Sequence, residues 1–234
     1  MVLSQVGRQV FGEVECVHCG KIRPKFTPCD CEEAVAIRQA HLAMDAEYER
    51  QRQIDQRKAA LKASRLPSRY HDARIESADR PPVVVVDYCK HHSGGLYLAG
   101  PVGVGKTHMA ACIVNSLLDA GESVLFGGVV SLLGMIQATY SGQGDEAAIM
   151  RQLSTVRYLV IDDIGKEKVS EWVEQTLYRV IDARYGEELP LIVTSNWTPD
   201  QLEKRYPTVG AAIVSRLAEM CLYAEMHGKD RRRG

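Results

Sequence analysis

The sequence predicts an α/β fold in which a parallel sheet lies between two layers of helices. Short apolar runs of strand length recur along residues 66–234, and helical stretches of about ten to twenty-five residues separate them. The run at 157–161 is apolar enough to be buried on both faces, as strands of parallel sheets are. These two observations favour βαβ units and a three-layer arrangement.

The elements follow in order along the chain. Residues 1–31 form a cysteine-rich segment without sustained periodicity, and 32–65 form a charged helical arm that contains no glycine or proline and ends at Leu66-Pro67. The remaining residues, 66–234, are expected to form the α/β domain. Its predicted strands are 95–99, 123–126, 157–161, 189–194 and 220–226, and its predicted helices lie within 109–118, 131–155, 171–184 and 210–218. The segment 83–88 is ambiguous, because its valines favour a strand whereas Pro81-Pro82 could begin a helix.

Composition excludes several classes. The 234 residues are 45% hydrophobic and 25% charged, which rules out collagen-like and wholly disordered chains. The net charge of −1 gives no indication of a nucleic-acid or membrane partner, so any such surface must be local. The apolar runs are far shorter than the roughly 18–20 residues that cross a bilayer, and the beginning of the chain lacks the pattern of a signal peptide. We therefore expect a cytoplasmic protein with no membrane partner.

A glycine-rich loop carries the strongest chemical signal. Gly100-Pro101-Val102-Gly103-Val104-Gly105-Lys106-Thr107 fits the pattern G-x4-G-K-[ST], between a predicted strand and a predicted helix. Glycines let backbone N–H groups surround phosphate oxygens, and the helix N-terminus adds a favourable partial charge. Lys106 is expected to reach the β- and γ-phosphates of ATP or ADP, and Thr107 to ligate Mg²⁺. The alternative is a strand-to-helix turn without a ligand.

Polar residues follow two other predicted strands. Asp162 and Asp163 come directly after an apolar strand, at the end where ligands bind in open α/β sheets. Asp162 is expected to hold Mg²⁺, and Asp163 to polarise the attacking water as a general base. Asn196 comes just after the strand at 189–194, in the run Thr194-Ser195-Asn196. It could contact the γ-phosphate or orient the water, although Thr-Ser-Asn is also typical of a helix or turn cap.

Four of the seven cysteines lie within sixteen residues near the start of the chain. Cys16, Cys19, Cys29 and Cys31 supply the four thiolates of a closed tetrahedral Zn²⁺ site. In a segment without a core of its own, the metal would take the place of that core. His18 is a conceivable substitute ligand, and free thiols are the alternative. Cys112 is expected to pack in the core.

Taken together, these motifs resemble those of AAA+ ATPases, and within that class the bacterial and phage replicative helicase loaders of the DnaC/DnaI type. The resemblance covers roughly residues 66–234, and the cysteine cluster with its charged helix is similar to the N-terminal region of DnaI-like loaders. The residues that carry it are Gly100–Thr107, Asp162–Gly165, Ile181–Tyr185, Thr194–Asn196 and Ser215–Met220.

The resemblance implies a P-loop NTPase sheet in the order 5-1-4-3-2 and ATP sites shared between subunits of an oligomer. It places Asn196 at the sensor-1 position and Arg216 at the arginine-finger position, where a finger raises hydrolysis about 10³–10⁵-fold. It places Arg232, rather than Arg231, near the sensor-2 position. A surface ion pair is the alternative for Arg216, and a solvated basic tail is the alternative for Arg232. The Asp-Asp pair suits a slow, assembly-dependent ATPase.

The function that the resemblance implies is ATP-dependent loading of a hexameric replicative helicase onto single-stranded DNA. Residues 1–64 are the candidate for binding the helicase, and the helices within 131–155 for approaching DNA. Tyr140 could stack on a base, but core packing is favoured. The alternatives are a transposition helper of the IstB type and an adaptor that binds ATP with little hydrolysis. A small-molecule kinase is disfavoured because no second substrate-binding motif is apparent.

Overall fold

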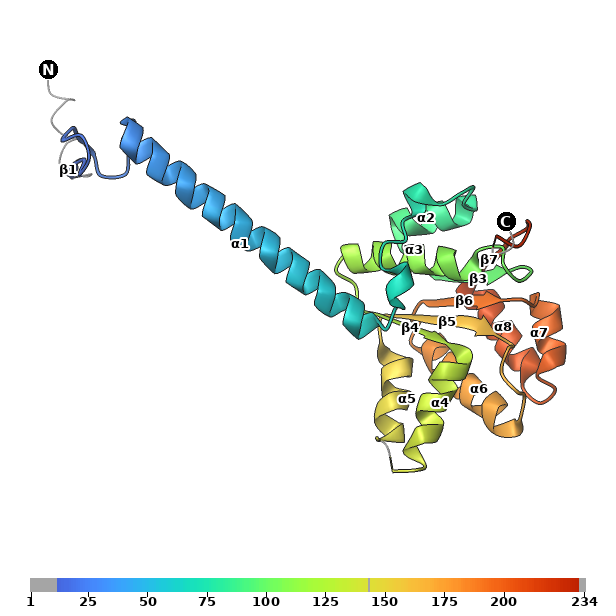
Figure 1. Ribbon diagram of the computed structural model, residues 1–234. Helices are drawn as coiled ribbons and strands as arrows, with labels where there is room; N and C mark the ends of the chain where they lie inside the picture. Colours follow the sequence, from blue (N-terminus) through green and yellow to red (C-terminus); the bar gives the residue numbers. More distant parts are fainter. Residues whose placement is uncertain (1–11, 143, 232–234) are drawn as a thin grey trace, which may run out of the picture. The chain divides into compact units, whose positions relative to one another are not determined.

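The computed structural model describes residues 12–142 and 144–231, and the chain divides into two units, Met1–Gln56 and Arg57–Gly234 (Figure 1). Our division at residues 31 and 65 remains a prediction. The segment predicted to be helical forms α1 (Glu32–Ser64), which runs from the first unit into the second.

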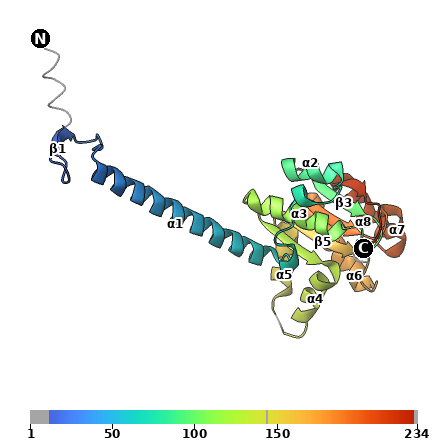
Figure 2. The ribbon, with the colours of Figure 1, turned by 45° about the horizontal axis from the view of Figure 1, so that its top comes forward.

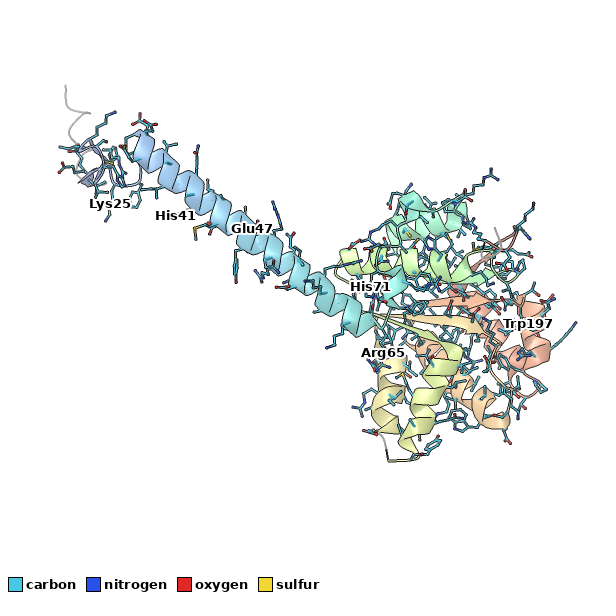
Figure 3. All side chains as sticks on the ribbon, in the orientation of Figure 1. Lys25, His41, Glu47, Arg65, His71 and Trp197 are labelled. Carbon is cyan, nitrogen blue, oxygen red and sulfur yellow. The ribbon has the colours of Figure 1, made fainter. Side chains whose placement is uncertain are left out.

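The first unit has almost no apolar core. Strand β1 (Glu13–Glu15) pairs antiparallel with β2 (Ile22–Pro24), a short hairpin that the irregular sequence pattern did not reveal. Along α1, side chains such as those of His41 and Glu47 project from the helix surface (Figure 3). Glu47 pairs with Arg50 at 3.5 Å, and similar i,i+3 pairs contribute only a few tenths of a kcal/mol each. Among described residues 12–56, only Cys16 and Cys29 are buried.

The second unit begins with the last turns of α1, which pack on the domain. The Arg57 guanidinium donates to Oδ1 of Asn115 at 2.5 Å and pairs with Asp119 at 2.6 Å. Two 3₁₀ turns follow, η1 (Ser68–Tyr70) and η2 (Ile75–Ser77), and then helix α2 (Val83–His91). The ambiguous valine run is therefore helical: Pro82 stands at its N-cap, and Val85 and Tyr88, three residues apart, are its buried side chains.

Five strands form one parallel sheet, shown from two directions in Figures 1 and 2. They are β3 (Gly95–Ala99), β4 (Val124–Gly128), β5 (Tyr158–Ile164), β6 (Leu191–Ser195) and β7 (Cys221–Glu225). Their order, β4-β5-β6-β3-β7, is the predicted order 5-1-4-3-2 read from the other edge. The predicted fold class is confirmed.

Helices cover both faces of this sheet. They are α3 (Lys106–Asp119), α4 (Val129–Thr139), α5 (Glu146–Thr155), α6 (Glu171–Gly186), α7 (Pro199–Arg205) and α8 (Gly210–Met220). Leu96 and Leu98 of β3 belong to the core beneath α2 and α3, whereas Tyr97 and Ala99 belong to the core shared with α4, α5, α6 and α8. Cys112 packs in the α3 core as predicted. In the described part of the chain, no helix combines the length and apolarity needed to cross a membrane.

One buried cation fixes the end of the sheet where β5 and β6 begin. Arg184 of α6 is fully buried and donates to the carbonyls of Leu153, Val156, Arg157 and Pro190 at 2.6–3.1 Å. Burial lowers the pKa of Arg184 to about 10, so the guanidinium remains charged at neutral pH. These bonds join the C-terminal end of α5 to the segments that enter β5 and β6.

We expect Arg184→Met to lower the free energy of unfolding by roughly 3–5 kcal/mol, because it leaves several buried carbonyls without donors. Urea denaturation followed by circular dichroism measures this change. Arg179→Met is the matched control on the same helix, since Arg179 is 59% exposed and pairs with Glu146 only at 3.8 Å. Equal stabilities of the two variants would contradict the assigned role.

Candidate functional site

The glycine-rich loop connects β3 to α3, as its pattern predicted. Gly100, Gly103 and Gly105 all have positive φ, and Gly105 is the N-cap of α3. Lys106 is the first residue of the helix and is only 5% exposed. Its ammonium donates to the carbonyls of Gly100 at 2.7 Å and Pro101 at 2.8 Å, and to Oδ1 of Asn196 at 2.8 Å. The loop and the end of β6 therefore meet at this lysine.

Asp162 lies beside the loop, near the end of β5, and is 7% exposed. Its Oδ2 accepts a hydrogen bond from Thr107 at 3.1 Å, and its Oδ1 accepts one from Thr194 at 2.6 Å. Burial raises the pKa of Asp162, and these two hydroxyls partly oppose the shift. A threonine hydroxyl touching a carboxylate is a suitable pair of oxygen ligands for Mg²⁺, so the residues present fit that ion.

Asp163 follows with a backbone conformation that is uncommon for a side-chain-bearing residue. Its φ is +61°, and the pairing of β5 with β6 is irregular between Ile161 and Ile164. Its N–H donates to the Thr194 hydroxyl at 2.8 Å, and its carboxylate pairs with Lys166 at 2.5 Å. Sequence reasoning assigned no role to Thr194 or Lys166. Ile192 and Thr194 are two residues apart in β6 and therefore point to the same face of the sheet, and Ile192 packs in the core that contains α3. This alternation was the available signal that Thr194 points inward on the α3 side.

These groups line one cleft of about 410 Å³. Among its lining residues are Lys106, Thr107, Asp163, Lys166, Asn196 and Arg231, together with Arg69, Tyr70, Ser77, Asp79 and His108 from the preceding turns and α3. The Tyr70 and His108 rings lie 6.4 Å apart. The structure thus brings together the predicted loop, Asp162, Asp163 and Asn196, and it adds a wall from residues 69–79 that the sequence did not indicate.

The segment after β7 closes another side of the cleft. The Met226 N–H donates to the Ala99 carbonyl at 2.8 Å, and the Arg231 N–H donates to the Gly103 carbonyl at 3.1 Å. A Cβ on Gly100 would lie 2.2 Å from the Met226 carbonyl oxygen, and one on Gly103 would lie 1.9 Å from the Asp230 carboxylate. A side chain at Gly100 or Gly103 would collide with the C-terminal segment. The position of this segment therefore requires glycine at both places, in addition to any role of the loop with phosphate.

Arg231 reaches from this segment to the opposite wall. Its guanidinium donates to the Asp79 carbonyl at 2.8 Å and lies 3.7 Å from the Asp79 carboxylate. Arg232, the arginine predicted to be sensor 2, lies outside the described residues. The arginine that the structure places at the cleft is Arg231, which the spacing argument ranked second.

Arg216, the predicted finger, is not among the residues that line the cleft. On α8 its Nε donates to Asp182 at 2.7 Å, its Nη2 donates to the Tyr178 hydroxyl at 2.9 Å, and the guanidinium stands over the Tyr178 and Tyr185 rings. Within one chain Arg216 is an ion-pair partner on the α6–α8 surface. A role at a nucleotide would require a neighbouring subunit.

The expected core packing of Tyr140 was wrong. We favoured core packing, but the side chain is 60% exposed, because Tyr140 lies just past the last turn of α4. Trp172 donates to its hydroxyl at 3.0 Å, and the two rings pack edge to face with centroids 6.3 Å apart.

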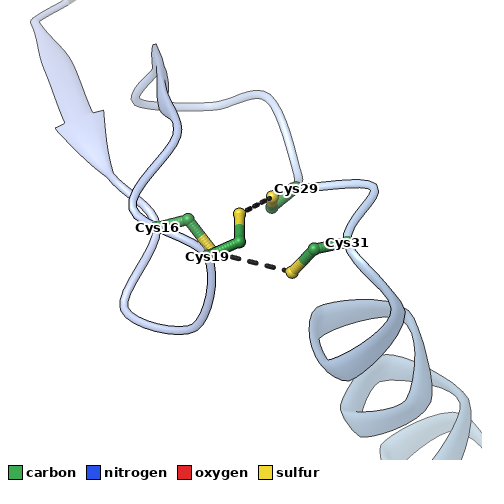
Figure 4. A group of neighbouring side chains, drawn as sticks. All are labelled: Cys16, Cys19, Cys29 and Cys31. Atoms are coloured by element: carbon green, nitrogen blue, oxygen red, sulfur yellow. Dashed lines mark hydrogen bonds between the residues drawn. The ribbon is translucent and has the colours of Figure 1, made fainter.

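The four clustered cysteines converge in the first unit, as Figure 4 shows. Their sulfurs all lie within 4.8 Å of one another, with Cys16 to Cys31 at 3.8 Å and Cys19 to Cys29 at 3.4 Å. Zinc–sulfur bonds of about 2.3 Å place tetrahedral thiolates roughly 3.8 Å apart, so the set fits Zn²⁺. Backbone N–H groups of Cys19 and His18 lower the pKa of Cys16 to about 6, whereas burial and the neighbouring thiols raise the pKa of Cys31 to about 12. The four thiols thus share their protons in this cluster, and binding of a metal would release them.

Comparison with known proteins gives consistent matches. The sequence matches the family described as "IstB-like ATP binding protein" over residues 38–233. It is 28% identical over 163 residues to the replicative helicase loader DnaI of Bacillus subtilis, covering 63% of this chain and 52% of that protein. It is 31% identical over 120 residues to the replicative helicase loader DnaC of Escherichia coli, covering 51% and 48%. The chain thus spans about half the length of these relatives.

A crystal structure of DnaI has the same fold, with a TM-score of 0.60. It is 24% identical in sequence and covers 69% of this chain and 94% of that chain.

We expect one Zn²⁺ per chain, measured by elemental analysis of the purified protein, and its loss in Cys16→Ser because three thiolates leave the tetrahedral site open. The second unit should keep its thermal transition, since its core does not include the cluster. Cys89→Ser, outside the cluster, is the control and should retain the metal. A metal-free native protein, or full zinc in the Cys16 variant, would refute the site.

Proposed function

The chain belongs to the family of IstB-like ATP binding proteins, and on that premise we propose that it is an ATP-dependent loader of a hexameric replicative helicase onto single-stranded DNA. The observation that carries the proposal is that Lys106 contacts Asn196 at one cleft, and that Thr107, which lines the same cleft, contacts Asp162 behind it. Two relatives named as replicative helicase loaders support the choice of partner.

In this proposal the loop Gly100–Gly105 and the α3 N-terminus hold the phosphates of ATP or ADP. Lys106 would exchange its carbonyl partners for the β- and γ-phosphate oxygens, which carry more negative charge. Thr107 and Asp162 are the residues that would hold Mg²⁺, which, when bound, neutralises charge on the phosphates.

The general base is Asp163. As the water oxygen bonds to the γ-phosphorus and the bond to the bridging oxygen of ADP breaks, the proton of the water passes to the Asp163 carboxylate. Asn196 would contact the γ-phosphate or orient that water, since its amide is already within 2.8 Å of the Lys106 ammonium.

Assembly would complete the site. Arg216 would reach the γ-phosphate of a neighbouring subunit, with Asp182 and Tyr178 holding its guanidinium. Arg231 or Arg232 would contact phosphate from the C-terminal segment, and Arg231 has the support of its place at the cleft. Hydrolysis would then be slow in the single subunit and would depend on self-association.

The first unit is the proposed contact with the helicase. Three large apolar side chains near its hairpin are exposed, Val17 by 90%, Phe26 by 76% and Ile22 by 69%, and we propose that they make this contact. Single-stranded DNA is the second proposed partner. It would approach α4 and α5, where the exposed Tyr140 ring could stack on a base. Both partners would be met in the cytoplasm.

A transposition helper of the IstB type is the second candidate, because the family description itself names that group. An adaptor that binds ATP with little hydrolysis is the third, and the Asp163–Lys166 pair favours it. Capture of a transposase instead of a helicase would select the second candidate, and tight ATP binding without turnover in the presence of helicase and DNA would select the third.

We expect Lys106→Ala to weaken ATP binding about 10- to 100-fold, through loss of charge-assisted hydrogen bonds worth roughly 1.5–3 kcal/mol. Isothermal titration with ATP and Mg²⁺ measures it, and thermal denaturation verifies that the variant is folded. Lys204→Ala, an exposed lysine on α7, serves as the control. Undiminished binding by Lys106→Ala would overturn the proposed function.

We expect the double variant Val17→Asp and Phe26→Asp to lose binding to the replicative helicase of the source cell while keeping ATP affinity, because charge on an apolar contact surface opposes desolvation. Co-sedimentation with purified helicase measures this loss. Val83→Asp introduces the same charge at an 83% exposed valine of the other unit and should bind normally. Equal binding by all three proteins would contradict the assignment of the first unit.

A further inference from the structure

The turn that follows β5 places an ammonium group against the Asp163 carboxylate. Lys166 Nζ lies 2.5 Å from Asp163 Oδ2, and the Lys166 N–H donates to the Asp163 carbonyl at 3.2 Å. Both side chains line the nucleotide cleft together with Lys106 and Asn196. One oxygen of the proposed base therefore already has a charged partner.

The backbone of this turn is held from several sides. Thr194 accepts from the Asp163 N–H at 2.8 Å, and Ser195 donates to the Ile164 carbonyl at 2.8 Å. The buried Glu167 carboxylate accepts from the Gly165 N–H at 3.0 Å and from the Tyr206 hydroxyl. Asp163 and Lys166 are consequently fixed at their backbones, and only their side chains are free to change partners.

The pair is accessible enough to be broken. The Lys166 side chain is 47% exposed and that of Asp163 is 26% exposed, so water screens their attraction. Lys166 can therefore hold the Asp163 carboxylate while the ion pair is formed and release it when the pair separates.

We propose that Lys166 is a positioning residue that restrains the Asp163 carboxylate and keeps ATP turnover slow. The proposal rests on the proposed function, because it assigns Lys166 a role through the general base. While Oδ2 accepts from the ammonium, that oxygen does not accept the proton of the attacking water. Hydrolysis is faster when the pair separates, because both carboxylate oxygens can then accept the proton.

Steady-state ATP hydrolysis by the full chain, with Mg²⁺, tests this role. Lys166→Met should raise kcat about two- to five-fold, the modest change expected for a partly exposed ion pair, and should leave KM for ATP within about two-fold. Lys166→Arg, which keeps the pair, should retain the slow rate. Lys168→Met, an exposed lysine two residues along the same turn, is the matched control and should behave as the native chain.

The dependence on Asp163 is tested in the double variant. Asp163→Asn with Lys166→Met should have the same residual rate as Asp163→Asn alone, because the restrained group is gone. A native rate or a lower one in Lys166→Met, or a rise that persists in the double variant, overturns the inference alone. Bound ATP without turnover in both the native chain and Lys166→Met overturns the proposed hydrolysis together with this inference. ADP titration and thermal denaturation establish that each variant is folded.

Discussion

Burial of the central strands on both faces is the constraint on which the second unit depends. With α2 and α3 over one face and α4, α5, α6 and α8 over the other, the strand interiors have room only for apolar side chains. Polar groups are then placed where the strands end. Because parallel strands all end at the same edge, Asp162 and Asn196 meet the residues that follow β3 without any segment having to cross the core.

The two units solve the problem of stability in different ways. The second unit has two apolar cores, one on each face of its sheet. Of the described residues of the first unit, only two cysteines are buried, so apolar burial contributes little there. A metal bound by the four clustered thiolates would supply stabilisation that a core of this size cannot, as in other small thiolate domains.

Much of this arrangement was predictable from local pattern. The strands, the phosphate loop and the paired aspartates follow from apolar runs and fixed spacings, which act within a few residues. The segment 83–91 was ambiguous because valine propensity opposed the proline cap, and Tyr140 was placed wrongly because its neighbourhood depends on where α4 ends. Three contacts depend instead on turn geometry or long-range packing. They are Lys166 with Asp163, Arg231 with Asp79, and Arg184 with the carbonyls before β5 and β6 and at the end of α5. No periodicity encodes those contacts.

Arg184 has a mechanical consequence. By tying the amino ends of β5 and β6 to the end of α5, it gives the two strands that present Asp162 and Asn196 a common anchored base. Their opposite ends lie five to seven residues away, where Lys106 contacts Asn196 and Thr107 contacts Asp162. The relative height at which the two strands deliver these side chains therefore depends on one guanidinium at the far end of the sheet.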